Sequence, residues 1–224
     1  MLEQIKLGLK LVKYGLSFKM QIALAILFCL FGLITEYVSR SSNLLGGFYI
    51  LISAMFVIQL VISMDISLLV QTSPYKKKLQ TSMPVLACVP IMLGAYTVEV
   101  LIKGYFLYFH PEISADAGQQ ASIKGGLEGV IVLLFVTAIY MGFCFKYFAA
   151  AMIGLFVVVL PISIVFQMPF LVNFIGQLPF GWIVLAGYIL IPLGEFLAYQ
   201  LSKLLYKKDL SRYAFGASLK RAEK

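Results

Sequence analysis

Long apolar stretches separated by short polar segments dominate this chain. Six such stretches are predicted, at residues 20–37, 45–70, 83–109, 127–145, 147–166 and 179–203. A helix rising 1.5 Å per residue needs about 20 apolar residues to cross a ~30 Å hydrocarbon layer. The pattern therefore predicts an all-α integral membrane protein, with six transmembrane helices in a transmembrane domain at residues 20–203.

The division between the fourth and fifth predicted spans depends on one charge. The apolar stretch from Leu127 to Phe166 is too long for a single crossing, and Lys146 lies near its middle. A tight hairpin at Lys146 is the simplest way to place that charge outside the hydrocarbon layer.

The segments before and after the predicted spans are basic. In residues 1–19, apolar and polar positions recur on different faces of a helix, which predicts an amphipathic helix lying in the membrane interface. The apolar positions are Leu2, Ile5, Leu9, Val12 and Leu16, and the polar ones are Glu3, Lys6, Lys10, Lys13 and Ser17. A cytoplasmic extension of the first span is the alternative. Residues 204–224 are expected to form a basic cytoplasmic tail.

Two connecting segments have a distinctive composition. The sequence Ser-Pro-Tyr-Lys-Lys-Lys-Leu-Gln at residues 73–80 predicts a short helix on the membrane surface, with Ser73 as N-cap and Pro74 at the first helical position. The segment Gln167 to Leu178 is apolar, uncharged and too short to cross. It predicts a re-entrant hairpin whose backbone is covered by protein, and a plain hydrophobic loop is the alternative.

The distribution of cationic residues predicts the orientation. Of the eighteen lysines and arginines, fifteen fall in the termini and the connections on one side, and only Arg40, Lys103 and Lys124 fall on the other. Because positive charge is retained in the cytoplasm, both termini are expected there, which requires an even number of spans.

Composition narrows the function. The chain is 61% hydrophobic and 12% charged, whereas soluble domains carry about 25% charged residues. The net charge of +8 follows from membrane topology, so nucleic acid is not an expected partner. His110 is the only histidine, and no phosphate-binding loop or Gly-x-Ser-x-Gly elbow occurs. We therefore expect neither an enzyme nor a metal or cofactor site on this chain.

The candidate intramembrane polar residues are Asp65, Glu99, Lys103 and Glu195. Such residues are functional candidates, because a charge in hydrocarbon is costly. Glu99 precedes Lys103 by four residues, which predicts an ion pair along one helix face. Glu36 and Glu128 are expected close enough to the membrane surface to be hydrated. The intramembrane groups favour structural or gating contacts, and a proton relay is the alternative.

The order of these features resembles the permease subunit of type-two class ATP-binding-cassette (ABC) exporters, particularly compact bacterial permeases for peptides or toxins such as phenol-soluble modulins. The resemblance implies that residues 1–19 form a connecting helix and that residues 73–82 form a coupling helix on an ATPase. The implied docking residues are Ser73, Pro74, Tyr75, Lys76, Lys77, Lys78, Leu79 and Gln80, with Lys146 as a second cytoplasmic contact. The implied outer gate comprises Met168, Pro169, Phe170, Asn173 and Phe174.

The resemblance also implies a function. The chain would form half of a pathway for amphipathic or hydrophobic substrates in the bacterial plasma membrane. ATP and Mg would bind a separate ATPase subunit, and a second permease chain, identical or homologous, would complete the pathway. Two other functions remain open: the substrate-binding membrane subunit of a vitamin importer, and a membrane assembly protein without transport.

Overall fold

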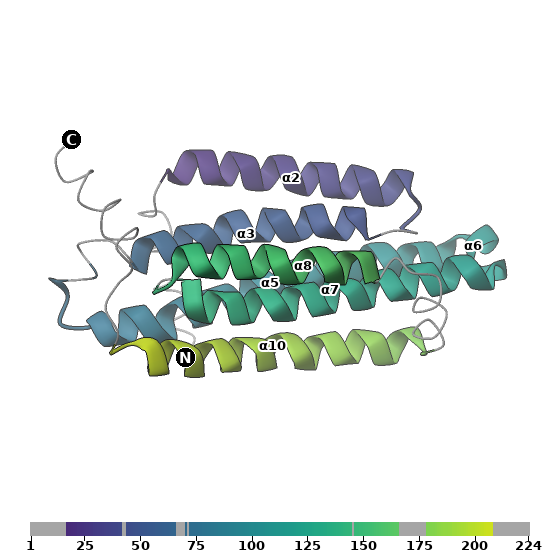
Figure 1. The fold of residues 1–224 in the computed structure, drawn as a ribbon. Helices are drawn as coiled ribbons and strands as arrows, with labels where there is room; N and C mark the ends of the chain where they lie inside the picture. Colours follow the sequence, from purple (N-terminus) through teal and green to yellow (C-terminus); the bar gives the residue numbers. More distant parts are fainter. Residues whose placement is uncertain are drawn as a thin grey trace.

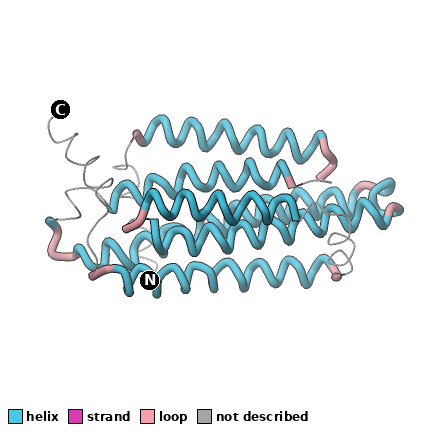
Figure 2. Tube along the Cα trace, in the orientation of Figure 1, coloured by secondary structure: helices cyan, strands magenta, loops and turns pink. Residues whose placement is uncertain are grey.

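A computed structural model describes residues 17–41, 44–65, 70, 72–144, 146–165 and 178–207. These residues contain helices and no strands. The helices are α2 (Phe18–Val38), α3 (Leu45–Asp65), α5 (Lys76–Phe109), α6 (Pro111–Ala115), α7 (Ala117–Cys144), α8 (Phe148–Val165) and α10 (Phe180–Leu205). The long helices lie side by side in one bundle and alternate in direction (Figure 1), and almost all of the described trace is helical (Figure 2).

The helices of the bundle have the length and apolar surface of membrane-spanning helices. Among the described residues, α2, α3, α5, α7 and α10 are each long and apolar enough to cross a bilayer. Large apolar side chains are exposed on the outer helices, for example Phe31 and Ile34 on α2 and Trp182 and Phe196 on α10. Apolar side chains exposed along helices of this length are suited to contact lipid. The chain is therefore embedded in a membrane.

The predicted hairpin at Lys146 matches the path of the chain. α7 ends at Cys144, the backbone N–H groups of Lys146 and Tyr147 both bond to the carbonyl of Phe143, and α8 begins at Phe148. α7 and α8 then pack against each other. The chain therefore reverses at the one lysine of this apolar stretch.

The cationic side chains divide between the two ends of the bundle. α2 begins and α10 ends at the same end (Figure 1). We call this the basic end, because it carries, among the described residues, Lys19, Lys76, Lys77, Lys78, Lys146, Lys203 and Lys207. The opposite end, where α6 lies, is the α6 end.

One predicted element was wrong. Residues 73–82 do not form a separate surface helix, because α5 runs without interruption through 34 residues from Lys76 to Phe109. No glycine or proline interrupts the chain between Lys76 and Met83, and Pro84 and Pro90 are accommodated within the helix. At 1.5 Å per residue α5 is about 51 Å long, which exceeds the hydrocarbon thickness.

Residues 110–126, the connection between the third and fourth predicted spans, are also largely helical. α7 begins at Ala117, well before the predicted start at residue 127, and α6 joins it to α5. Asp116 caps α7, since its Oδ1 accepts the N–H groups of Gly118 at 2.8 Å and Gln119 at 3.2 Å. The two helices and α6 extend past the rest of the bundle (Figure 1).

Small residues let α10 approach α5 and α7 closely. The Tyr96 ring of α5 lies directly over Gly187 of α10, and its hydroxyl donates to the carbonyls of Ile183 and Val184 at 3.3 and 3.2 Å. A Cβ added at Gly142 of α7 would lie 3.0 Å from Ala198. Such close contacts at glycines are typical of packing between membrane helices.

Candidate functional site

The most distinctive feature is a buried charge cluster near the α6 end, formed by Glu36, Glu99 and Lys103. Lys103 Nζ lies 3.3 Å from Glu36 Oε2 and 3.7 Å from Glu99 Oε2. The three side chains are 0%, 1% and 0% exposed in the order Glu36, Glu99, Lys103. The predicted Glu99–Lys103 pair is confirmed, whereas the prediction that Glu36 is hydrated is wrong, because α3 and α5 cover it.

The two carboxylates differ in their hydrogen bonds. Glu36 accepts the backbone N–H of Gly47 at 2.9 Å, the hydroxyl of Ser41 and the ammonium of Lys103. Neither carboxyl oxygen of Glu99 has a hydrogen-bond partner among the described residues. Glu36 is therefore the carboxylate equipped to remain charged, and Glu99 is held only by the longer ion pair.

Local backbone geometry brings these groups together. Arg40 and Ser41, in the turn after α2, have φ angles of 52° and 58°, and this tight reversal returns Ser41 to Glu36. At the start of α3, a side chain at Gly46 would collide with the Glu36 carboxyl group, and a Cβ at Gly47 would lie 3.3 Å from the Glu99 carboxyl carbon. Adjacent glycines thus let two carboxyl groups reach the surface of α3.

A second ion pair near the cluster is of a different kind. Arg40 Nη1 lies 2.9 Å from Glu112 Oε2, and the two side chains are 60% and 78% exposed. The pair links the turn after α2 to α6. Water screens it, so it contributes only about 0–1 kcal/mol to stability.

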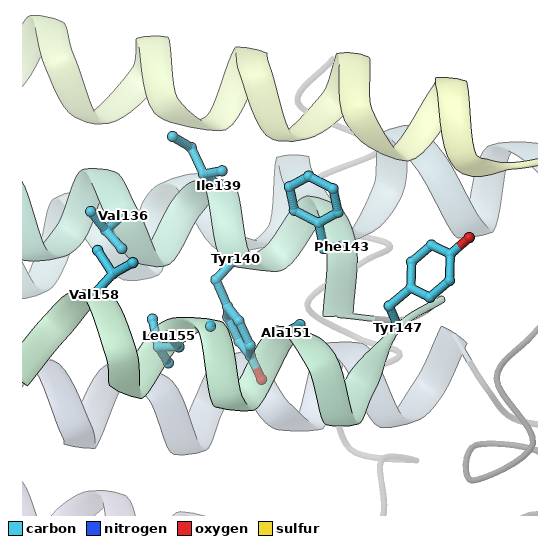
Figure 3. Close-up of a pocket in the computed structure, with 9 residues that line it drawn as sticks. Val136, Ile139, Tyr140, Phe143, Tyr147, Ala151, Leu155 and Val158 are labelled. Atoms are coloured by element: carbon cyan, nitrogen blue, oxygen red, sulfur yellow. The ribbon is translucent and has the colours of Figure 1, made fainter.

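An apolar groove of about 450 Å³ lies between α7 and α8 (Figure 3). This volume falls within the ~300–1,000 Å³ range of small-molecule sites. The groove is lined by Val136, Ile139, Tyr140 and Phe143 of α7, Tyr147 of the turn, and Ala151, Gly154, Leu155 and Val158 of α8. The sequence did not point to it, because its walls come from two helices whose facing sides depend on their packing.

The basic end holds the predicted docking segment. Ser73 and Pro74 precede α5 in a turn in which Ser73 Oγ accepts the Tyr75 N–H at 3.2 Å. The residue before the helix is Tyr75, so the predicted N-cap and first helical position are wrong by two residues. Lys77 and Lys78 are exposed in the first turn of α5. The segment thus presents charge at the very start of the longest helix.

Lys146 is not presented in the same way. Its side chain is 4% exposed, and its ammonium lies 5.9 Å from the centre of the Tyr206 ring. In this conformation the Lys146 ammonium group contacts the Tyr206 ring, at a distance typical of a cation–π interaction. The predicted second cytoplasmic contact would therefore require Lys146 to move.

The structure places the remaining predicted residues apart from these features. Glu195 is 1% exposed on α10, and neither of its carboxyl oxygens has a hydrogen-bond partner among the described residues. Asp65 is the last residue of α3, and its side chain lies outside the described part. The predicted connecting helix up to residue 16, the predicted gate at residues 168–174 and the tail beyond residue 207 also lie outside the described residues.

Chemistry and comparison leave the class of site open. Within the described ranges, no group of three or more His, Cys, Asp or Glu side chains could hold a metal ion. Comparison with protein-family models, with curated proteins and with solved structures finds no match.

Proposed function

We propose that this chain is the transmembrane permease subunit of an ATP-driven exporter of amphipathic substrates, working with a separate ATPase and a second permease chain. It crosses the bacterial plasma membrane six times, α8 being the fifth crossing, with both termini in the cytoplasm. The observation that carries the proposal is α5, because it joins an exposed basic segment to the buried charge cluster in one helix.

A continuous helix can transmit a displacement along its length. Lys78 and Lys103 are 25 positions apart on α5, which corresponds to about 38 Å at 1.5 Å per residue. A partner that moves the basic end of α5 therefore also displaces Glu99 and Lys103. Rigid-body movement of this kind is one of the standard ways in which two conformations interconvert.

The groove between α7 and α8 supports an amphipathic cargo. Its walls are apolar, while Tyr147 supplies a hydroxyl near the basic end. Phe143, Tyr147 and Val158 are 37%, 40% and 43% exposed, so the groove opens sideways towards lipid. A substrate with an apolar chain and a polar head could enter from the cytoplasmic leaflet without crossing water.

Reversing the charge of the docking segment is expected to uncouple the ATPase. The triple variant Lys76→Glu, Lys77→Glu, Lys78→Glu should bind the co-expressed ATPase subunit at least about tenfold more weakly, a loss of ~1.4 kcal/mol. Binding is measured with purified chains in lipid nanodiscs. Lys203→Glu with Lys207→Glu is the control, since these exposed lysines lie at the same end. Equal weakening in both variants, or no ATPase bound to the parent chain, would count against the proposal.

Filling the groove is expected to block the cargo. Gly154 lines the groove and has no atom within 4 Å of an added Cβ, so Gly154→Trp should occupy the space without disturbing the fold. Transport of a fluorescent amphipathic peptide into vesicles should fall about tenfold, which corresponds to ~1.4 kcal/mol of lost binding. Gly181→Trp is the control, because Gly181 is equally open but lies on α10. Unimpaired transport in Gly154→Trp would exclude the groove as the binding site.

A further inference from the structure

The buried charge cluster contains two carboxyl groups and one ammonium group. All three side chains are at most 1% exposed, so water cannot screen an excess charge. If Glu36 and Glu99 were both ionised, one negative charge would remain uncompensated inside the bundle. A buried charge without a partner costs several kcal/mol, and a bound proton is the simplest way to remove it.

The two carboxyl groups of the cluster differ in their hydrogen bonds. Glu36 accepts hydrogen bonds from Ser41, Gly47 and Lys103, and all of these stabilise a carboxylate. Glu99 has no hydrogen-bond partner among the described residues and lies 3.7 Å from Lys103. The hydrogen bonds and the closer ammonium group therefore favour a negative charge on Glu36, and Glu99 lacks such contacts.

Among the described residues, few charged groups act on Glu99. The charged groups that act on it are Lys103 on its own helix and Glu36 on α2. On α3 the Glu99 carboxyl group faces Gly47, and Val130 of α7 lies against the same glycine; neither residue can ionise. The exposed Arg40 is paired with Glu112.

We propose that Glu99 is a proton-binding site that controls the attachment of α2 to α5. With the proton on Glu99, Lys103 pairs with Glu36 and holds the α6 end of α2 in place. When Glu99 releases its proton to water, its new negative charge competes with Glu36 for Lys103. The Glu36–Lys103 contact then weakens, and the end of α2 separates from α5.

The proposal does not depend on the exporter function. α2 is the most exposed of the five candidate spans, with 11% of its apolar window buried. Its contacts with α5 at this end include the Glu36–Lys103 pair and the Tyr37 and Phe106 rings, whose centres are 6.3 Å apart. α2 packs mainly against α3, so loosening the pair removes one of the few direct contacts between α2 and α5.

Infrared spectroscopy of the full chain in lipid nanodiscs tests the protonation directly, because a carboxylic acid and a carboxylate absorb at different frequencies. The parent is the Glu128→Gln, Glu195→Gln chain, which lacks two other carboxyl groups with buried, unpartnered oxygens. At neutral pH it should show an acid band that disappears in Glu99→Gln. The band should also disappear in Glu36→Gln, because Glu99 then becomes the sole carboxylate partner of Lys103. Arg40→Gln should keep it.

A parent without the acid band, or a band that survives Glu99→Gln, would overturn the assignment. Each variant is first checked for a single symmetric peak on size-exclusion chromatography, and Glu99→Asp provides a variant that keeps the carboxyl group.

A reporter on α2 tests the coupling. Val38 is 76% exposed at the end of α2, so a fluorophore on Val38→Cys, with Cys29, Cys88 and Cys144 replaced by alanine, monitors the environment of this end. Raising the pH should shift the emission of the fluorophore in the labelled chain that keeps Glu99. The emission should stay unchanged in the same labelled chain with Glu99→Gln. An equal shift in both chains would show that α2 does not respond to Glu99.

Discussion

Lys103→Met is expected to destabilise the folded protein by about 3–5 kcal/mol, the cost of removing one partner from a buried ion pair. The substitution leaves Glu36 and Glu99 facing each other without a positive charge, in a site where no water can replace it. Stability is measured as the temperature at which half of the protein leaves the monodisperse peak on size-exclusion chromatography. The loss should shrink as the pH falls, because protonated carboxyl groups no longer need a counter-charge.

Arg40→Met provides the matched control for Lys103→Met. It also removes the cation of an ion pair near the same end, but from the exposed pair with Glu112. The expected change is only about 0–1 kcal/mol. Combining Lys103→Met with Glu36→Gln should recover part of the stability, because the carboxylate that Lys103 neutralises is then gone as well. Similar losses for Lys103→Met and Arg40→Met would mean that the cluster is hydrated.

Gly187→Ala is the second substitution for which we expect a large effect. The added methyl group would overlap the Tyr96 ring and hydroxyl, so α5 and α10 would have to separate and the Tyr96 hydrogen bonds to α10 would be lost. Overpacking of this kind costs about 1–3 kcal/mol. The same thermal assay should show a clear decrease in the unfolding temperature.

Gly181→Ala controls for the change from glycine to alanine in the same helix. A Cβ at Gly181 meets no atom within 4 Å, so the unfolding temperature should stay the same or rise slightly. Tyr96→Leu, added to Gly187→Ala, should restore part of the loss by removing the ring. If Gly187→Ala is as stable as Gly181→Ala, α5 and α10 do not pack in the way described.

The locations of the helices could be read from the sequence, but two boundaries could not. Apolar length predicted α2 and α10 to within two residues at each end, and the charge of Lys146 marked the turn between α7 and α8. The prediction began α5 at residue 83 and α7 at residue 127, where the apolar stretches begin. The actual helices also include residues 76–82 and 117–126, because polar residues can extend a helix beyond the hydrocarbon layer. The glycines of the second segment, Gly118, Gly125 and Gly126, do not interrupt α7.

The buried charge cluster was also only partly predictable from the sequence. The Glu99–Lys103 pair was predictable, since residues four apart on a helix are neighbours whatever surrounds them. Glu36 was not, because 67 residues separate it from Lys103 and its distance from the helix end indicated hydration. Gly46 and Gly47 were visible in the sequence, but only their contacts with Glu36 and Glu99 reveal why they are glycines.

The sequence by itself determined that this chain is helical and belongs in a membrane, because apolar length and the placement of lysines are local properties of the chain. Only the tertiary structure decided which charges are buried together and where a groove opens. Those features depend on how closely separate helices approach one another, and small residues far apart in the sequence set that distance.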